Sequence, residues 1–204
     1  MNVRHVVLAV SALDVPGIRM NPADRCYHCK KALFTLIKET AADAGVAHVA
    51  EGANADDARD FRPGARAVQE LGVLTPLRDA SLTKSEVREI SHELGLPTWD
   101  KPAYACLATR FPAGAELTAE RLRMVEQAER FLHELGFKQC RVRHHGNLAR
   151  IEVEKDKICA IIARPEMEAH LKEIGFEFVT VDLGGYRTGS MSKQPVKGND
   201  DDNR

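Results

Sequence analysis

The chain has 204 residues, with 29 basic and 30 acidic side chains, a net charge of −1 and 44% hydrophobic residues. At roughly 100–200 residues per domain, this length predicts one large domain or two small ones with a buried core. The balanced charge gives no general basic field that would attract nucleic acid, and no run of about 18 apolar residues could span a bilayer. We therefore expect a cytoplasmic protein that binds neither nucleic acid nor a membrane.

The first part of the chain predicts an α/β arrangement. Residues 6–10 have the apolar pattern of a buried strand, residues 30–44 have helical spacing, and residues 46–50 predict a second short strand. Residues 83–86 form a capping box, which marks the start of a further helix. We expect a small parallel sheet flanked by helices. The sequence predicts so few strands that this sheet would be incomplete.

The second part of the chain predicts a small α+β domain. Residues 118–135 have the strongest helical pattern, and residues 140–154 alternate about a turn as a hairpin. Residues 155–174 predict a helix broken at Pro165, and residues 177–182 a last strand.

The boundary between the two domains is expected near residue 114, after a proline-containing loop. The domains would then span residues 1–114 and 115–187. From about residue 188 the chain is polar, with no apolar pattern that could pack, so residues 188–204 are expected to form a disordered tail.

The chain has five cysteines, an odd number that argues against a secreted disulfide framework. Cys26 and Cys29 form a CxxC motif at the start of a helix, where free N–H groups and the helix dipole favour thiolate. The motif is typical of half a metal site, although a redox pair or a coincidence would have the same spacing. We favour metal, with His28 as a bystander between the two thiols.

Of the other three cysteines, one is a candidate for metal binding or reaction, and two are expected in the core. Cys106 lies in a loop between Lys101 and Arg110, whose charges would favour its thiolate, while the alternative is a small buried hydrophobe. Cys140 and Cys159 occupy inward-looking positions and are expected in the core. Three thiolates suit either zinc, which requires a fourth ligand, or an iron–sulfur cubane with one open iron.

Two further segments carry groups that suit anions and cations. The loop at residues 51–57 follows a strand, and Asn54 and Asp57 suit Mg²⁺ or a nucleotide, although a solvated turn would look the same. Arg141 and Arg143 alternate along one strand and Arg150 lies on the return strand, so they could converge on a phosphate or carboxylate. The alternative is a solvated strand face, and His144 and His145 are expected to belong to a turn.

These motifs, in this order, resemble the LarE family. The segments that carry the resemblance are residues 21–30, 51–57, 61–64, 82–84, 94–102, 106–110 and 141–146. LarE proteins are ATP-dependent sulfur transferases that build the nickel-pincer nucleotide cofactor of lactate racemase. The resemblance implies a PP-loop (ATP-pyrophosphatase, adenine-nucleotide alpha hydrolase-like) domain with a parallel sheet, followed by a small α+β domain, and usually a homo-oligomer.

The resemblance also implies a reaction and its residues. In the family, Mg²⁺-ATP adenylates a carboxylate of pyridinium-3,5-biscarboxylate mononucleotide, and a sulfur nucleophile then displaces AMP. The sulfur comes either from a sacrificed cysteine of the CLxxR motif or from a 4Fe-4S cluster held by three cysteines. Here Cys26, Cys29 and Cys106 match the cluster type, and Cys106 and Arg110 are the catalytic candidates of the CLxxR motif.

The remaining assignments carry over motif by motif. The substrate phosphate would be bound by Arg141 and Arg143, with Glu129 on the long helix supporting that part of the site. Nucleotide or Mg²⁺ would face Asn54, Asp57 and Lys101. Zinc, or no metal at all, is the alternative to the cluster.

One family motif has no counterpart in the sequence. The Gly-rich SGGxDS loop that cradles the pyrophosphate of ATP is missing, and Ser11 is the only comparable serine. A start codon placed too late, a loop on a separate polypeptide, or a degenerate remnant that only binds metal or substrate would each explain this. We expect an enzyme if the loop is supplied, and a non-catalytic metal- or cluster-binding protein otherwise.

Overall fold

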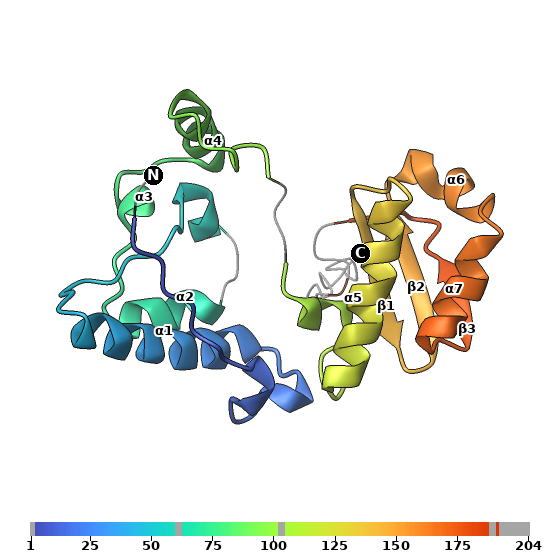
Figure 1. The fold of residues 1–204 in the computed structure, drawn as a ribbon, viewed down its shortest axis with the longest axis horizontal. Coiled ribbons are helices and arrows are strands. Elements are labelled where there is room, and N and C mark those ends of the chain that lie inside the picture. Colours follow the sequence, from blue (N-terminus) through green and yellow to red (C-terminus); the bar gives the residue numbers. More distant parts are fainter. Residues whose placement is uncertain (1–2, 60–62, 102–104, 188–190, 192–204) are drawn as a thin grey trace, which may run out of the picture. The chain divides into compact units, whose positions relative to one another are not determined.

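The computed structural model describes residues 3–59, 63–101, 105–187 and 191. The chain forms two compact units, residues 1–105 and 106–204 (Figure 1), and each is described by itself. The sequence predicts a boundary near residue 114, but the observed division lies between residues 105 and 106. The short helix η4 (Leu107–Arg110) belongs to the second unit because it packs against a helix and a strand of that unit. The tail expected from residue 188 lies outside the described residues, apart from Met191.

The first unit consists mainly of helices. They are η1 (Ala12–Asp14), η2 (Ile18–Met20), α1 (Arg25–Asp43), η3 (Ala55–Arg59), α2 (Pro63–Glu70), α3 (Pro76–Asp79) and α4 (Lys84–Glu93). Helices α1 and α2 lie side by side (Figure 1). A small core between them is formed by Phe34, Val68 and Val73, with Ile37 and Leu71 packed against it.

The strand expected at residues 6–10 is wrong. This segment forms no regular element and pairs with no strand among the described residues, and Val7 remains 78% exposed. A run of β-branched residues forms a strand only where its backbone groups find a partner. Beside the segment lies an apolar groove of about 550 Å³ along α1, lined by Val6, Leu8, Leu33 and Ile37 among others.

The second expected strand, at residues 46–50, is reduced to a single parallel bridge between Ala50 and Leu74. Its two hydrogen bonds run from the Leu74 N–H to the Val49 carbonyl and from the Glu51 N–H to the Leu74 carbonyl, both at 2.9 Å. The parallel direction matches the α/β pattern of the sequence, but the described part of this unit contains no regular sheet.

In the first unit, the helix start marked by the capping box at residues 83–86 is confirmed, whereas the helix expected over residues 30–44 begins earlier in the chain. Helix α1 begins at Arg25, so Cys26 and Cys29 lie within its first two turns. Helix α4 begins with a complete capping box: the Glu86 N–H donates to Thr83 Oγ1, and the Thr83 N–H donates to Glu86 Oε2. No helix in the described residues is long and apolar enough to cross a membrane.

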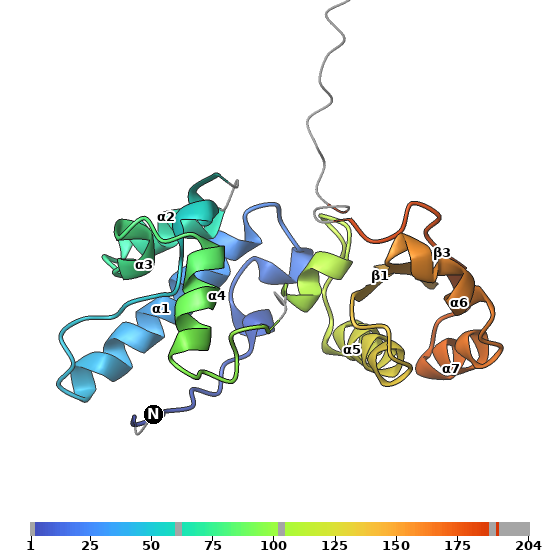
Figure 2. The ribbon, with the colours of Figure 1, turned by 90° about the horizontal axis from the view of Figure 1, so that it is seen from above.

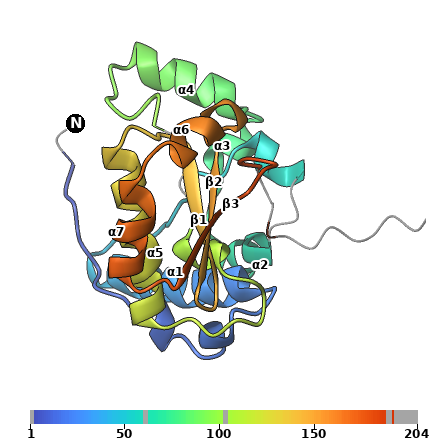
Figure 3. The same ribbon diagram turned by 90° about the vertical axis from the view of Figure 1, so that its right-hand side faces the viewer.

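The second unit is a three-stranded sheet with helices on one face (Figures 2 and 3). After η4, its elements are α5 (Ala119–Glu134), β1 (Cys140–His145), β2 (Leu148–Val153), η5 (Lys155–Lys157), α6 (Ile158–Ile162), α7 (Glu166–Ile174) and β3 (Phe178–Val181). Strand β2 pairs antiparallel with β1 and parallel with β3. The expected long helix, hairpin, broken helix and last strand are all confirmed.

The two faces of this sheet differ in character. Val142, Ala149 and Ile151 are fully buried on one face of the sheet, and Val125 and Leu132 of α5, which packs against β1, are fully buried as well. Because side chains alternate along a strand, the arginines of β1 and β2 lie on the opposite face. The charged side chains of the sheet are thereby separated from its apolar core.

The two cysteines expected in the core differ in outcome. Cys140 is fully buried on the core face of β1, as expected. Cys159 is exposed, contrary to our expectation. Helix α6 has only five residues and turns Ile158 and Ile161 inward, so Cys159 beside them faces outward.

We predict that Thr118→Ala destabilises the second unit by about 1 kcal/mol, because Thr118 Oγ1 accepts the hydrogen bond that caps α5, 3.1 Å from the Arg121 nitrogen. Urea unfolding followed by circular dichroism measures the change. Thr118→Ser keeps the acceptor oxygen and is the matched control. An equal loss in both variants would show that the cap contributes nothing.

Candidate functional site

The CxxC turn at the start of α1 is held by contacts to α2. The Tyr27 hydroxyl donates to Glu70 Oε2 at 2.7 Å, and the Arg66 guanidinium lies 3.8 Å from the centre of the Tyr27 ring. Cys26 is exposed and Cys29 half-buried, on either side of this anchored tyrosine. The turn is therefore fixed by its intervening residue while both thiols stay outside the apolar core.

Gly64 permits the close approach of α2 to this turn. A Cβ atom at position 64 would lie 3.2 Å from the Cys26 carbonyl oxygen and 2.9 Å from Lys30 Cδ. The lysine side chain can move, but the helix backbone cannot move without displacing Cys26. His28 lies between the two cysteines in the sequence, and its Nε2 is 3.2 Å from Asp24 Oδ2.

The loop that carries Asn54 and Asp57 is closed by its own polar groups. The Asn54 N–H donates to Asp57 Oδ2, and Asn54 Oδ1 accepts from the Asp56 N–H, both at 3.0 Å. The structure thus brings Asn54 and Asp57 together. Lys101 lies in the same unit, and its carbonyl accepts a hydrogen bond from Arg88 at 2.9 Å.

In the second unit, Cys106 is exposed at the start of η4. Its carbonyl oxygen accepts hydrogen bonds from Thr109 Oγ1 at 2.8 Å and from Arg110 Nη1 at 3.0 Å. Arg110 therefore contacts the backbone of Cys106. These bonds fix the turn from which the thiol projects.

Arg110 is itself held by a buried ion pair. Its side chain is only 2% exposed and makes two parallel bonds to Glu129, from Nε to Oε1 at 2.9 Å and from Nη2 to Oε2 at 2.8 Å. Glu129 Oε1 also accepts from the Val142 N–H on β1 at 2.9 Å. The pair thus joins the Cys106 turn, helix α5 and strand β1.

The face of the sheet away from the helices is charged and largely buried. Arg141 and Arg143 are 6% and 5% exposed, and Glu152 is completely buried between them and Arg150. Arg143 donates to Glu152 Oε2 at 2.7 Å and Arg150 donates to Oε1 at 3.2 Å. The solvated strand face considered as an alternative is therefore wrong.

This charged face reaches the Cys106 turn. Arg143 Nη1 donates to the Thr109 carbonyl at 3.1 Å, next to Arg110 in sequence. The guanidinium of Arg141 lies 5.3 Å from the centre of the Tyr186 ring. Four of the predicted site residues, Cys106, Arg110, Glu129 and Arg143, are thus linked by one set of hydrogen bonds.

Glu152, Asp182 and Tyr186 also belong to this site and were not predicted from the sequence. The signal that could have found Glu152 is its place in the hairpin, where it pairs with Arg141, since a buried arginine requires a carboxylate partner. Asp182 lies 3.5 Å from Arg150 Nε. The contacts of Asp182 and Tyr186 depend on how the chain returns after β3, for which the sequence has no local signal.

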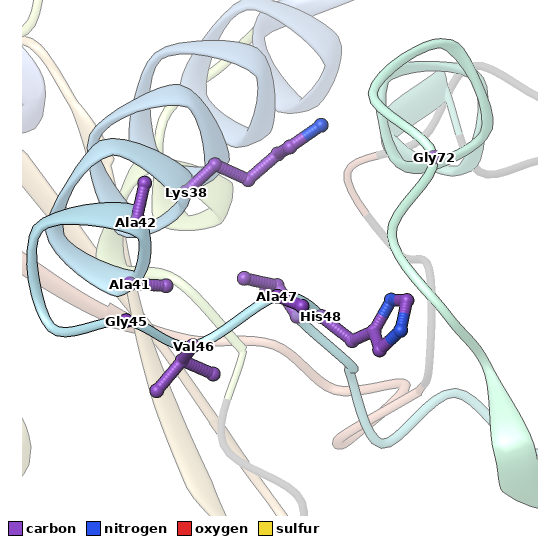
Figure 4. Close-up of a pocket in the computed structure, with 9 residues that line it drawn as sticks. Lys38, Ala41, Ala42, Gly45, Val46, Ala47, His48 and Gly72 are labelled. Carbon is purple, nitrogen blue, oxygen red and sulfur yellow. The ribbon is translucent and has the colours of Figure 1, made fainter.

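The structure does not place all predicted site residues in one unit. Cys26, Cys29, Asn54, Asp57 and Lys101 belong to the first unit, and the other predicted residues to the second. Among the described residues of either unit, no three His, Cys, Asp or Glu side chains gather in a metal-binding arrangement. The cavity of about 350 Å³ near the end of α1 (Figure 4), which is lined by Lys38 and His48 among others, contains none of the predicted residues.

Three known proteins are similar in sequence to this chain. No family model matches the chain. It is 40% identical over 200 residues to an uncharacterized protein of Synechocystis sp., covering 97% of this chain and 75% of that protein. An uncharacterized protein of Methanocaldococcus jannaschii is 32% identical over 188 residues, with 92% and 74% covered.

A third relative has a named function. It is the pyridinium-3,5-bisthiocarboxylic acid mononucleotide synthase of Lactiplantibacillus plantarum, 38% identical over 181 residues, which cover 88% of this chain. The match spans 66% of that synthase. The chain and these three relatives are homologous over most of the length of this chain. The chain belongs to the LarE family.

We predict that Glu129→Gln destabilises the second unit by about 3–5 kcal/mol, because it leaves the buried Arg110 guanidinium without its counter-charge. The measurement is the free energy of unfolding in urea. The double variant Arg110→Met/Glu129→Leu removes both charges and is expected to recover most of the loss. A double variant as unstable as the single one would contradict the uncompensated charge as the cause.

We also predict that stability falls at acidic pH through His144. This ring is buried between Phe111, 4.8 Å away in a stacked arrangement, and Phe176 at 5.5 Å. Burial, followed by the charge of Arg121, lowers the pKa of His144 below 6.5. The unfolded chain then binds the proton more tightly, so this stability is fully present above about pH 6.5 and is lost as the pH falls through the lowered pKa.

Urea unfolding between pH 8 and pH 5 tests this expectation. His144→Phe keeps an aromatic ring in the stack and removes the titrating group, so its stability is expected to depend less on pH. His170→Gln, at a half-buried position of α7 where the ring stacks on Phe131 at 3.9 Å, serves as the control for loss of a histidine from an aromatic stack. Equal slopes for wild type and His144→Phe would disprove the role of His144.

Proposed function

We propose that the chain performs ATP-dependent sulfur transfer in the synthesis of the nickel-pincer nucleotide cofactor of lactate racemase. Its substrate would be pyridinium-3,5-biscarboxylate mononucleotide. Membership of the LarE family supports the reaction class. The observation that carries the proposal is the buried arginine face, which is hydrogen-bonded to the turn that bears Cys106.

Arg141 and Arg143 bind the phosphate of the mononucleotide in this proposal. Arginine presents a planar fork of N–H donors that suits phosphate oxygens. With Arg150 they bring three positive charges to the face, against the carboxylates of Glu152 and Asp182. The excess positive charge favours an anion, and Glu152 holds Arg143 and Arg150 in place.

Cys26, Cys29 and Cys106 hold a 4Fe-4S cluster in this proposal. The donor set fits the group in kind: all three residues are cysteines, Cys26 and Cys106 are exposed, and Cys29 is half-buried. Three cysteine ligands leave one iron open, and the cluster would supply a sulfide there. The chain's own part is to present the thiols from two fixed turns, one anchored by Tyr27 and the other by Arg110.

The carboxylate of the substrate requires activation before sulfur can attack it. A carboxylate oxygen attacks the α-phosphorus of ATP and pyrophosphate leaves; sulfide then attacks the carboxyl carbon, and AMP departs with the oxygen. Asn54, Asp57 and Lys101 face the nucleotide or its Mg²⁺. The first unit would be part of a PP-loop domain, with the SGGxDS loop supplied by further sequence or a separate polypeptide, in a homo-oligomer.

We predict that the chain, purified and reconstituted without oxygen, binds about four irons and at least four acid-labile sulfides per chain. Single substitutions Cys26→Ser, Cys29→Ser and Cys106→Ser are expected to lose most of both. Cys159→Ser removes an exposed thiol that has no assigned role and is the matched control. Zinc alone, or cluster content unchanged in Cys106→Ser, would overturn the three-cysteine cluster.

We predict that Arg143→Gln raises the KM for the pyridinium mononucleotide at least tenfold, because one charge-assisted contact to phosphate is lost. Substrate-dependent AMP release, in the presence of a polypeptide that supplies the ATP loop, measures this. Arg164→Gln alters an exposed arginine paired with Glu166 and is the control. If no pairing ever yields AMP, the chain is a non-catalytic metal- or cluster-binding protein.

A further inference from the structure

One residue of the charged face has no role in the proposal above. Arg141, Arg143 and His145 occupy alternate positions on β1, so their side chains lie on the same face of the sheet. His145 is half-buried at the end of the strand that adjoins the hairpin turn. It was expected to belong to the turn only, whereas the structure places it in line with the two arginines.

The imidazole of His145 has an unsatisfied nitrogen. Nε2 is buried and has no hydrogen-bond partner within the part of the chain that the structure describes. A buried polar atom without a partner costs free energy, on the order of 1–3 kcal/mol. Such an atom beside a cationic face is a group that a bound ligand can satisfy.

The charges around His145 explain its state in the absence of a ligand. Burial comes first, followed by the positive charges of Arg150 on β2 and Arg143 on β1, and together they lower the pKa of His145. Glu152, also on β2, acts in the opposite direction, and the Thr109 carbonyl of η4 accepts from Arg143 on this face. The ring is therefore neutral near pH 7.

An anion bound on this face would instead favour the protonated form of His145. Two negative charges near the arginines would favour the imidazolium form, and its Nε2–H would gain an acceptor. We infer that His145 is a third ligand of the anion bound by Arg141 and Arg143, and that it takes up a proton when this anion binds. The inference rests on the anion-binding role proposed for the two arginines.

The test uses the full chain and sulfate, which remains a dianion across the range used. Histidine ring resonances are followed by NMR from pH 5 to pH 8, with sulfate and with chloride at equal ionic strength. Sulfate is expected to raise the pKa of His145 by about one unit and to leave His170, on α7, unchanged. By linkage, sulfate then binds about tenfold more tightly at the acidic end of the range than at the basic end.

Substitutions separate this inference from the proposed function. His145→Gln keeps a polar group and is expected to remove the pH dependence of sulfate binding, while Arg143→Gln is expected to remove the binding itself. Sulfate binding that depends on Arg143, with the titration of His145 unchanged, would overturn the inference and leave the proposed function intact. If sulfate does not bind at all, both the inference and the assignment of the arginines fail. The NMR titration uses the unaltered chain, so its outcome does not depend on whether a variant folds.

Discussion

The buried ion pair between Arg110 and Glu129 is the contact on which the second unit depends. It joins three segments that are distant in sequence: the turn after Cys106, helix α5 and strand β1. A guanidinium so far from water requires a carboxylate with matching geometry, and the two parallel bonds provide it. The Cys106 turn and the arginine face are consequently parts of one rigid arrangement.

The second unit could be predicted from sequence to a greater extent than the first. Its helical pattern at residues 118–135, hairpin turn and helix break at Pro165 are local signals, and each is confirmed. In the first unit, residues 6–10 have the composition of a strand, but a strand also requires a partner, which its own periodicity cannot specify. The same limit explains why residues 46–50 yield only the bridge between Ala50 and Leu74.

The candidate site could likewise be predicted from the sequence only in part. The cysteines and Arg141 and Arg143 could be selected because their spacing is unusual in itself. The contacts of these residues could not be predicted, because Glu152 approaches across a strand pair and Thr109 approaches from a separate loop. Arg110 illustrates the difference best: its position beside Cys106 suggested action on the thiol, whereas its fork is directed to Glu129 and to the backbone carbonyl of Cys106.

The anchoring of Tyr27 also affects how strongly the two thiols of the CxxC turn would hold a metal. Two thiols that are already held on one ordered turn form a preorganised chelate, so a metal bound to both loses less chain entropy than it would on a flexible loop. Because Tyr27 is anchored to Glu70 and covered by Arg66, both on α2, this order lasts only while α2 stays docked. Local opening of α2 and release of a bound metal are thus thermodynamically linked, and a metal at these thiols would slow hydrogen exchange in a helix it does not touch.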